Sequence, residues 1–343
     1  MPRIAIIGTG LIGASIGLRM REQSGITDLE IVGSDDSSGH LKRAEKIGAI
    51  DCGMRNPREA VQNASLVVLA TPVLSMRRLM TDIAPALTSG AIVTDTGSTK
   101  AEVLTWAKSE LPRTVSFIGG HPMAGKTESG PAFADASLFE DARWAIVPMA
   151  NASEGSLKTI RNLVETMGAT PMFMDAEEHD AYVAAISHLP LMAATALFTM
   201  VHESEAWPEL SELAAGGFKD MTRLTGTEPN VAFDIAITNR TQIIHWIERY
   251  REALLGLQER LSDKDGEEEF FRYIAEAHWD YTGYRAGNVG RQEIDEKMAP
   301  IPRTEIANLF MGEALASKMR DLTAASDARV EELERKARVT RRE

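Results

Sequence analysis

Cysteine and long apolar segments are both scarce in this chain of 343 residues. The single cysteine, Cys52, can form no intrachain disulfide, which fits a reducing compartment. The apolar run SLVVLATPVL (65–74) is too short to cross a bilayer, and the N-terminal MPRIAIIGTG lacks the apolar stretch of a signal peptide. We therefore expect a cytoplasmic protein that does not contact a membrane.

Clustered positive charge is missing as well. The chain has 37 Lys and Arg against 50 Asp and Glu, a formal net charge of −13, and its body contains no basic stretch. Nucleic-acid binding through phosphates depends on such a stretch, so we expect no nucleic-acid partner. An anionic small molecule needs only a local cationic group and stays compatible with this composition.

The first half alternates short β-branched runs with helical patterns. This alternation predicts βαβ units and an α/β fold with a doubly wound, mostly parallel sheet of the Rossmann type. The predicted strands are 3–8, 29–35, 65–71, 91–98, 116–122 and 143–149, with helical patterns at 11–22 and 41–49.

The second half changes to an almost wholly helical pattern near residue 177. We expect three parts: a nucleotide-binding domain (1–174), a helical substrate and dimerisation domain (175–264), and a helical extension without an assigned role (265–343). The apolar spacing over 231–261 predicts one amphipathic helix of unusual length. Helices of this length often pack across a subunit boundary, so we expect a homodimer formed through the helical domain.

The motif GTGLIG follows the first predicted strand and opens the first predicted helix, which is the context of a dinucleotide-binding turn. Gly8 allows the tight turn, Gly10 lets the backbone approach a pyrophosphate, and Gly13 permits close packing of helix and strand. The first helical residues, Leu11 and Ile12, supply amide groups to the anion.

Two further segments are expected at the cofactor. Asp35 ends the second predicted strand, where a carboxylate accepts hydrogen bonds from the adenosine ribose and repels a 2′-phosphate. Asp36 follows it in place of an arginine, so we expect NAD rather than NADP. Thr71 and Pro72 follow the third predicted strand and are expected where the strand ends face the cofactor.

The segment GGHP, at the end of the fifth predicted strand, contains the candidate catalytic residue His121. A nicotinamide enzyme that oxidises an alcohol needs a base for the hydroxyl proton, and histidine, with an ordinary pKa of about 6.5, is the usual one. The fourth predicted strand ends at the same edge in TDTGSTK. Ser98 is therefore expected near His121, orienting it or binding the substrate hydroxyl. We predict no metal site.

Five segments together resemble the prephenate and arogenate dehydrogenases of tyrosine biosynthesis. They are GTGLIGASIGL (8–18), TDTGSTK (94–100), GGHPMAG (119–125), HDAYVAAISHLP (179–190) and GGFKDMTRL (216–224). The resemblance covers roughly residues 3–262. It implies an oxidative decarboxylation in which a cyclohexadienol gives hydride to NAD, loses its ring carboxylate as carbon dioxide and becomes aromatic.

The resemblance also implies residue roles. His121 matches the base, Ser98 the serine beside it, and Arg223 the arginine that binds a substrate carboxylate. The alternative for Arg223 is a surface ion pair with Asp220 or Glu228, and the sequence leaves both open.

Five of the other histidines are interpreted, one as a candidate and four as structural residues. His188 matches a histidine near the active site, although a core histidine bonded to the backbone fits equally well. The remaining four are interpreted as structural: His179, His202, His245 and His278.

Two positions depart from the family pattern. Thr127 stands where many members have glutamate, and Leu191 stands where many prephenate-preferring members have a second histidine. Thr127 therefore becomes the expected substrate contact in that loop, and the preference tilts toward arogenate or toward both substrates. The alternatives are another two-domain hydroxyacid or imine oxidoreductase, and a non-catalytic NAD-binding scaffold.

Overall fold

The computed structural model describes residues 2–26, 28–126, 128–150 and 152–287. Contacts divide the chain into two compact units, residues 1–258 and 259–343, which we treat separately. The three-part division expected from the sequence stays a prediction. Most of the predicted helical extension, residues 288–343, lies outside the described residues.

An eight-stranded sheet with the order β3-β2-β1-β4-β5-β6-β7-β8 forms the first part of the larger unit. Every neighbouring pair is parallel except β6 and β7. The α/β prediction is therefore confirmed, and two short strands that it missed, β3 and β8, extend the sheet. The strands are β1 (Arg3–Ile7), β2 (Glu30–Ser34), β3 (Cys52–Met54), β4 (Leu66–Leu69), β5 (Ile92–Asp95), β6 (Ser116–Pro122), β7 (Arg143–Pro148) and β8 (Thr170–Phe173).

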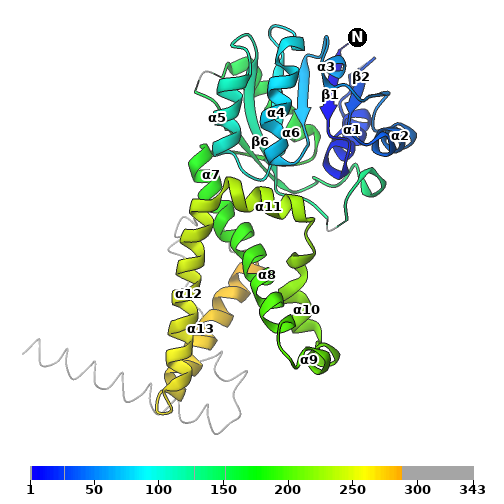
Figure 1. Cartoon of the computed structure of the whole chain (residues 1–343). Coiled ribbons are helices and arrows are strands. Elements are labelled where there is room, and N and C mark those ends of the chain that lie inside the picture. The colour runs from blue at the N-terminus through cyan, green and yellow to red at the C-terminus, as the bar shows by residue number, and fades with distance from the viewer. Residues whose placement is uncertain (1, 27, 127, 151, 288–343) are drawn as a thin grey trace, which may run out of the picture. The chain divides into compact units, whose positions relative to one another are not determined.

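Helices cover both faces of this sheet, because alternate side chains of each strand point to opposite sides. Ile4 and Ile6 of β1 pack in a core with α1 (Leu11–Gln23), α2 (Ser38–Lys46) and α6 (Glu154–Thr166). Ala5 and Ile7 pack in a second core on the other face. That core contains residues of α3 (Pro57–Ala60), α4 (Val73–Ile83) and α5 (Ala101–Glu110), and α4 and α5 lie side by side there (Figure 1).

The rest of the larger unit is helical. A π-helical turn, η3 (Ala184–His188), joins the first two helices of this part, and Pro190 follows it. Proline lacks an amide hydrogen and disrupts the regular bonding of a helix, which explains the local change of pitch. The helices are α7 (Ala176–Val183), α8 (Leu189–His202), α9 (Trp207–Leu213), α10 (Gly216–Thr222), α11 (Pro229–Thr238) and α12 (Arg240–Ser262), with a short 3₁₀ turn η4 (Arg223–Gly226).

The single long helix predicted over 231–261 is wrong, because the chain breaks at Asn239 between α11 and α12. Asn239 has φ −122° and ψ 28°, outside the helical range. Its buried side chain bonds to a backbone carbonyl and to a histidine, so tertiary hydrogen bonds replace helix continuity at this point. The apolar spacing continues through the break and therefore did not reveal it.

The smaller unit contains helix α13 (Glu267–Arg285). Within this unit the guanidinium carbon of Arg260 lies 4.8 Å from the ring centroid of Tyr273. Such a cation–π contact at an exposed site contributes about 0.5–1 kcal/mol.

Candidate active site

Four neighbouring parallel strands, β1, β4, β5 and β6, end at one edge of the sheet (Figure 1). The residues that follow or finish them are Gly8, Thr71, Ser98 and His121. Ligands of open α/β sheets bind outside the carboxyl ends of the strands. The fold therefore brings the predicted cofactor and catalytic segments to the same edge.

The glycine turn has the geometry that a dinucleotide requires. Gly8 has φ +94°, and a Cβ there would lie 2.3 Å from the carbonyl oxygen of Ala70. A side chain on Gly13 would collide with the carbonyl oxygen of Gly8 at 1.9 Å, whereas the space over Gly10 is open. Helix α1 begins at Leu11 with no side-chain cap and no acidic residue in its first turn. The first amides of α1, including those of Leu11 and Ile12, are therefore available to an anion that occupies this space.

Asp35 braces this turn from the end of β2. Its carboxylate accepts hydrogen bonds from the amide of Thr9 at 2.8 Å, the hydroxyl of Thr9 at 3.1 Å and the amide of Ser37 at 2.9 Å. Thr71, which was expected at the cofactor, lies against the same turn, because its Cγ2 would be 2.9 Å from a Cβ on Gly8. Pro72 is the N-cap residue of α4 and is exposed.

His121 lies within β6 and is 9% exposed. Its Nδ1 is 2.9 Å from Nε2 of His179, and Nδ1 of His179 is 2.8 Å from Oδ1 of Asp180. Burial lowers the pKa of His121 well below 6.5, and the nearby His179, Lys100 and His188 lower it further. At neutral pH the His121 ring is therefore uncharged and able to accept a proton.

A buried ion pair lies beneath His121. Nζ of Lys100 donates to Oδ2 of Asp95, and both side chains are fully buried. The other carboxylate oxygen of Asp95 accepts the amide of Gly120 at 3.1 Å. A side chain at Gly120 would lie 2.6 Å from the carbonyl oxygen of Asp95, so only glycine fits beside this pair. Removal of one partner of such a pair typically costs about 3–5 kcal/mol, because the other charge stays buried.

Ser98 does not orient His121 in this structure. Within the part of the chain that the structure describes, the Ser98 side chain makes no hydrogen bond, and His179 takes the position at Nδ1 of His121. The sequence analysis interpreted His179 as structural and so missed this contact. Its place directly before Asp180 was the available signal, because an aspartate beside a histidine can fix the ring.

His188 is buried, with 1% of its surface exposed, at the end of η3. Its Nδ1 is 3.1 Å from the side-chain nitrogen of Asn239, which also donates to the backbone carbonyl of Asp180 at 2.7 Å. Nε2 of His188 is buried without a partner among the described residues. Burial lowers the pKa of His188 to about 4, although Asp180 opposes this shift. The alternative of a histidine bonded to the backbone does not hold at either ring nitrogen.

The remaining predicted substrate residues differ in environment. Arg223 is exposed at the start of η4, and it forms no ion pair with Asp220 or Glu228 in the described structure. Glu228 instead caps α11 through the amide of Val231. Leu191 is 6% exposed in the core of the helical part. Thr127 lies outside the described residues.

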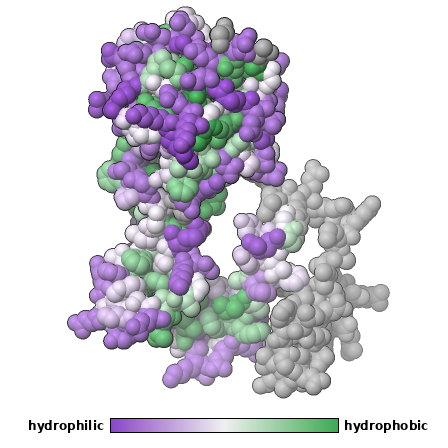
Figure 2. Space-filling view, turned by 90° about the vertical axis from the view of Figure 1, so that its right-hand side faces the viewer, coloured by the Kyte–Doolittle hydropathy of each residue, from purple (hydrophilic) through white to green (hydrophobic). Residues whose placement is uncertain are grey.

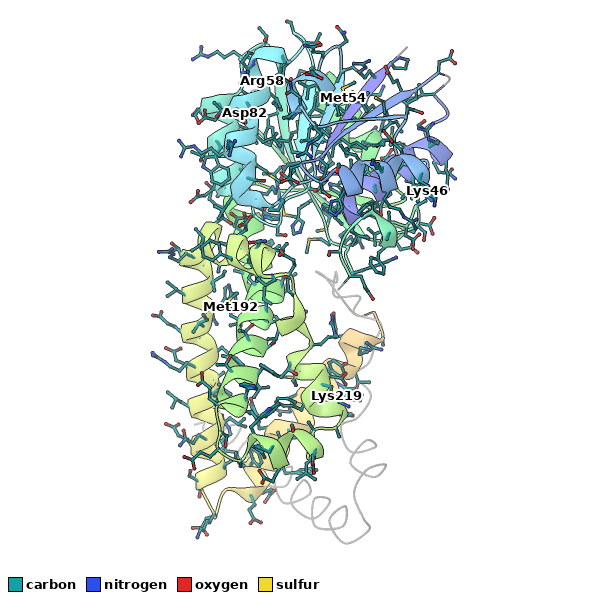
Figure 3. All side chains as sticks on the ribbon, turned by 45° about the vertical axis from the view of Figure 1, so that its right-hand side comes forward. Lys46, Met54, Arg58, Asp82, Met192 and Lys219 are labelled. Carbon is teal, nitrogen blue, oxygen red and sulfur yellow. The ribbon has the colours of Figure 1, made fainter. Side chains whose placement is uncertain are left out.

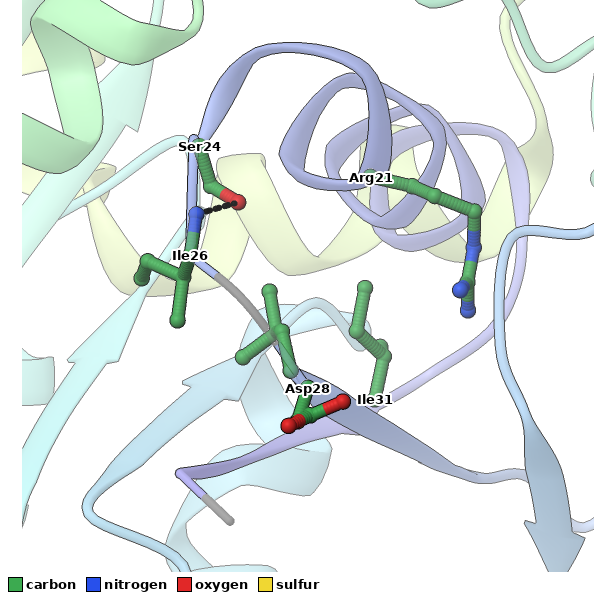
Figure 4. A pocket seen from close by; sticks show the side chains of 6 residues that line it. Arg21, Ser24, Ile26, Asp28 and Ile31 are labelled. Carbon is green, nitrogen blue, oxygen red and sulfur yellow. Dashed lines mark hydrogen bonds between the residues drawn. The ribbon is translucent and has the colours of Figure 1, made fainter.

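A shallow pocket lies at the opposite edge of the sheet, after α1 and before β2 (Figure 4). Its one arginine, Arg21, already binds Asp51 at 2.8 Å and the carbonyl of Gly48 at 2.8 Å. We assign no function to this pocket. Its lining consists of Arg21, Ser24, Ile26, Asp28, Leu29 and Ile31. The described residues contain no cluster of acidic, histidine or cysteine side chains able to hold a metal ion.

Comparisons with known proteins agree with this arrangement. Residues 16–172 match the family described as prephenate dehydrogenase, nucleotide-binding domain, and residues 175–276 match prephenate dehydrogenase, dimerization domain. The chain is 32% identical over 292 residues to a prephenate dehydrogenase of Bacillus subtilis (strain 168). The match covers 84% of this chain and 77% of the relative.

Two solved structures are also similar. One is a prephenate dehydrogenase from A. aeolicus in complex with hydroxyphenyl propionate and NAD+. It is 29% identical with a TM-score of 0.76, and the match covers 83% of this chain and 98% of that one. The other is an arogenate dehydrogenase of Synechocystis. It is 27% identical with a TM-score of 0.69, and the match covers 82% of this chain and 99% of that one.

The fold and the site define an oxidoreductase with a dinucleotide-binding sheet domain followed by a helical domain. The sequence matches then narrow this class. The chain belongs to the prephenate dehydrogenase family, as its motifs predicted.

Proposed function

We propose that this enzyme oxidatively decarboxylates prephenate, arogenate or both, with NAD as hydride acceptor and His121 as the base. The observation that carries the proposal is a buried, uncharged His121 at the same sheet edge as the glycine turn, in a chain of this family. The family match argues against the hydroxyacid, imine and scaffold alternatives.

The residues around the glycine turn fit NAD. The open space over Gly10 and the uncapped start of α1 suit a pyrophosphate, and the carboxylate of Asp35 suits a ribose. When bound, the nicotinamide supplies the hydride acceptor. Asp36 is exposed beside Asp35 and adds a second negative charge against a 2′-phosphate, so NAD is favoured over NADP.

His121 takes the proton of the substrate hydroxyl while the carbon that bears this hydroxyl loses its hydride. The ring carboxylate then leaves as carbon dioxide, and the electrons of the broken carbon–carbon bond complete the aromatic ring. General-base assistance of this kind contributes about 10²–10⁴-fold to the rate. Ser98 follows Gly97 in the loop after β5. It remains a proposed partner of the substrate hydroxyl rather than of His121.

Arg223 and His188 are the proposed substrate-binding groups. Arg223 is a free cation among the described residues and can grip a carboxylate bidentately. Leu224, next to it, packs against the core cluster that contains Leu191, three residues after His188, and η4 contacts α8. The two groups therefore lie on segments that pack together. The role expected of Thr127 also stays a prediction.

A homodimer through the helical domain is the proposed assembly, since residues 175–276 match a dimerization domain. Apolar residues reach the surface of the helical part (Figure 2). Large exposed side chains include Ile186, Met200, Phe233, Ile244 and Leu254. A second copy of the chain would cover such surface, and sedimentation at micromolar concentration should therefore show a dimer. A monomer under those conditions would contradict this assembly.

The same apolar surface bears on the membrane prediction. The run Ala176–His202 is long and apolar enough to cross a bilayer by length and composition alone, with a mean hydropathy of 1.6. It also contains the buried polar residues His179, Asp180 and His188, which favour a place inside a folded domain. The absence of membrane contact and the cytoplasmic location stay predictions.

The direct test is the absorbance of reduced nicotinamide when the full chain is mixed with NAD and either prephenate or arogenate. We expect a signal with at least one substrate and carbon dioxide in equal amount. Parallel reactions with each substrate measure the preference. The absence of signal with both would overturn the proposed function.

A further inference from the structure

Two buried histidines of the site, His121 and His188, are connected to one residue by separate hydrogen-bond chains. The Asp180 carboxylate reaches His121 through His179, and the Asp180 backbone carbonyl reaches His188 through Asn239. We propose that Asp180 sets opposite tautomers on these histidines, leaving Nε2 of His121 as an acceptor and Nε2 of His188 as a donor. The catalytic meaning of this arrangement rests on the proposed function.

The hydrogen bonds that connect Asp180, His179 and His121 have a fixed donor and acceptor at each step. The Asp180 carboxylate accepts the amides of Lys100 at 2.8 Å and Ala101 at 2.9 Å, at the start of α5. An aspartate carboxylate at the positive end of a helix can only accept hydrogen bonds. Nδ1 of His179 must therefore donate to it. In a neutral His179 ring, Nε2 then has a lone pair and accepts the Nδ1 hydrogen of His121.

It follows that the single proton of a neutral His121 ring lies on Nδ1. Its Nε2 has a free lone pair and no hydrogen-bond partner among the described residues. This is the atom that a general base must present to a hydroxyl group. Asp180 and His179 do not need to touch the substrate to have this effect, so they are positioning residues.

The hydrogen bonds that connect Asp180, Asn239 and His188 place the ring proton of His188 on the other nitrogen, Nε2. A backbone carbonyl can only accept, so the 2.7 Å contact with the Asp180 carbonyl identifies the Asn239 atom as the amide nitrogen. The same nitrogen then donates to Nδ1 of His188. A neutral His188 ring must therefore have its proton on Nε2, the buried atom without a partner among the described residues. A buried donor of this kind is normally satisfied by water or a ligand.

The two tautomers suit a substrate that offers both a hydroxyl and an anionic or carbonyl oxygen. Nε2 of His121 accepts the hydroxyl proton, while the Nε2 hydrogen of His188 donates to the oxygen. His188 contributes to the lowered pKa of His121, so the two rings lie within range of each other's charge. If both tautomers were reversed, Nε2 of His121 would have a hydrogen and could not act as the base. Nε2 of His188 would then have a lone pair, which would repel the lone pairs of an anionic or carbonyl oxygen.

The test is nitrogen NMR of the full chain with ¹⁵N-labelled histidine, without substrate, because the ring nitrogen shifts distinguish the tautomers. The signals of His121, His179 and His188, three of the seven histidines, are assigned with His121→Asn, His179→Gln and His188→Asn. We expect the proton on Nδ1 in His121 and His179 and on Nε2 in His188. A wild-type His121 with its proton on Nε2, or a doubly protonated His179, would overturn the proposal.

Asp180→Asn probes the cause. Both carboxylate oxygens of Asp180 accept a backbone amide, so the amide nitrogen of asparagine replaces one of these acceptors in either orientation. In the orientation that faces His179, it donates to that ring, reverses it and moves the His121 proton to Nε2, with kcat lowered about 10²–10⁴-fold. His188 should keep its tautomer, because its connection runs through the backbone of residue 180. A folded Asp180→Asn variant in which the His188 tautomer changes, or in which His121 has its proton on Nε2 while His179 keeps its proton on Nδ1 alone, would contradict the assignment.

Asp234→Asn is the matched control. Asp234 also contacts the start of a helix, since its carboxylate accepts the amide of Leu74 in α4 at 2.9 Å, but it contacts no histidine. All three tautomers should survive this change. If Asp180→Asn does not fold, His179→Gln tests the same chain, because its amide can donate to Asp180 and accept from His121.

His179→Gln should keep the His121 proton on Nδ1 and retain more activity than His179→Leu, which offers no acceptor. Equal loss of activity in these two variants, with the same His121 tautomer in both, would overturn the positioning role. The NMR result needs no substrate. If the tautomers are as expected but neither prephenate nor arogenate is oxidised, the proposed function alone fails.

Discussion

The side-chain amide of Asn239 donates to Nδ1 of His188 across 3.1 Å, at the point where α11 ends and α12 begins. The break in the helix and the fixed ring of His188 therefore have the same origin. Asn239 is a polar residue that ends a helix within an apolar core, and the hydrogen bonds of its side chain stabilise it there. Burial keeps this histidine neutral, which makes stability depend on pH.

Acid should destabilise the fold through His188. Its folded-state pKa is about 4 against an ordinary value of 6.5, so the unfolded chain binds more protons between these values and stability falls as pH decreases. Because a difference of one in pKa corresponds to about 1.4 kcal/mol, lowering the pKa from 6.5 to about 4 corresponds to roughly 3 kcal/mol. His188→Asn removes this contribution. Urea unfolding at fixed protein concentration should therefore show a shallower loss of stability from pH 6.5 to 4 in the variant than in the wild type. Equal slopes would contradict the buried, neutral state of His188.

The sequence predicted the sheet and its binding edge well, because those depend on local patterns. Alternating β-branched runs, the glycine turn and GGHP each indicate their structure within a few residues. The contacts of His179 and Asn239 join segments up to 59 residues apart, such as Asp180 and Asn239. No local pattern encodes these contacts. The same limit explains why the break in the long helix was missed, and why Ser98 was expected where His179 lies.

Cofactor preference should depend on the two aspartates after β2. Wild-type kinetics should favour NAD, and Asp35→Ser combined with Asp36→Arg should shift the preference toward NADP. Asp35 also braces Thr9 of the glycine turn, so the double variant should bind both cofactors less tightly. Asp36→Arg alone keeps these bonds and serves as the control. A wild type that already prefers NADP would refute the assignment.

His121→Asn should lower kcat by about 10²–10⁴-fold with little change in NAD affinity. In the wild type, protonation of His121 should abolish activity, so kcat/KM falls on the acid side. Because burial lowers the pKa of His121 well below 6.5, the fall should begin well below that pH. Steady-state kinetics over a range of pH values measures this acid-side fall in kcat/KM. An acid limb at or above pH 6.5, or a variant within a few-fold of wild type, would exclude His121 as the base.

Arg223→Ala should raise the KM for the substrate tens-fold or more. A lost contact between a buried charge pair typically costs about 2–5 kcal/mol of binding. The Arg223 side chain is exposed and without an ion pair in the described structure, so its removal should leave the melting temperature unchanged. Lysine should restore only part of the affinity, because it lacks the bidentate fork of arginine. NAD affinity should stay near the wild-type value.

The matched control for Arg223→Ala is Lys219→Ala. Lys219 lies on α10, four residues before Arg223, and is also an exposed cation (Figure 3). If general attraction between positive charge and an anionic substrate set the affinity, both variants would raise KM by a similar small factor. High salt would then remove the difference in KM between each variant and the wild type. A specific carboxylate contact predicts a large effect at Arg223 alone. Similar KM values in the wild type and Arg223→Ala would leave Arg223 outside the substrate site.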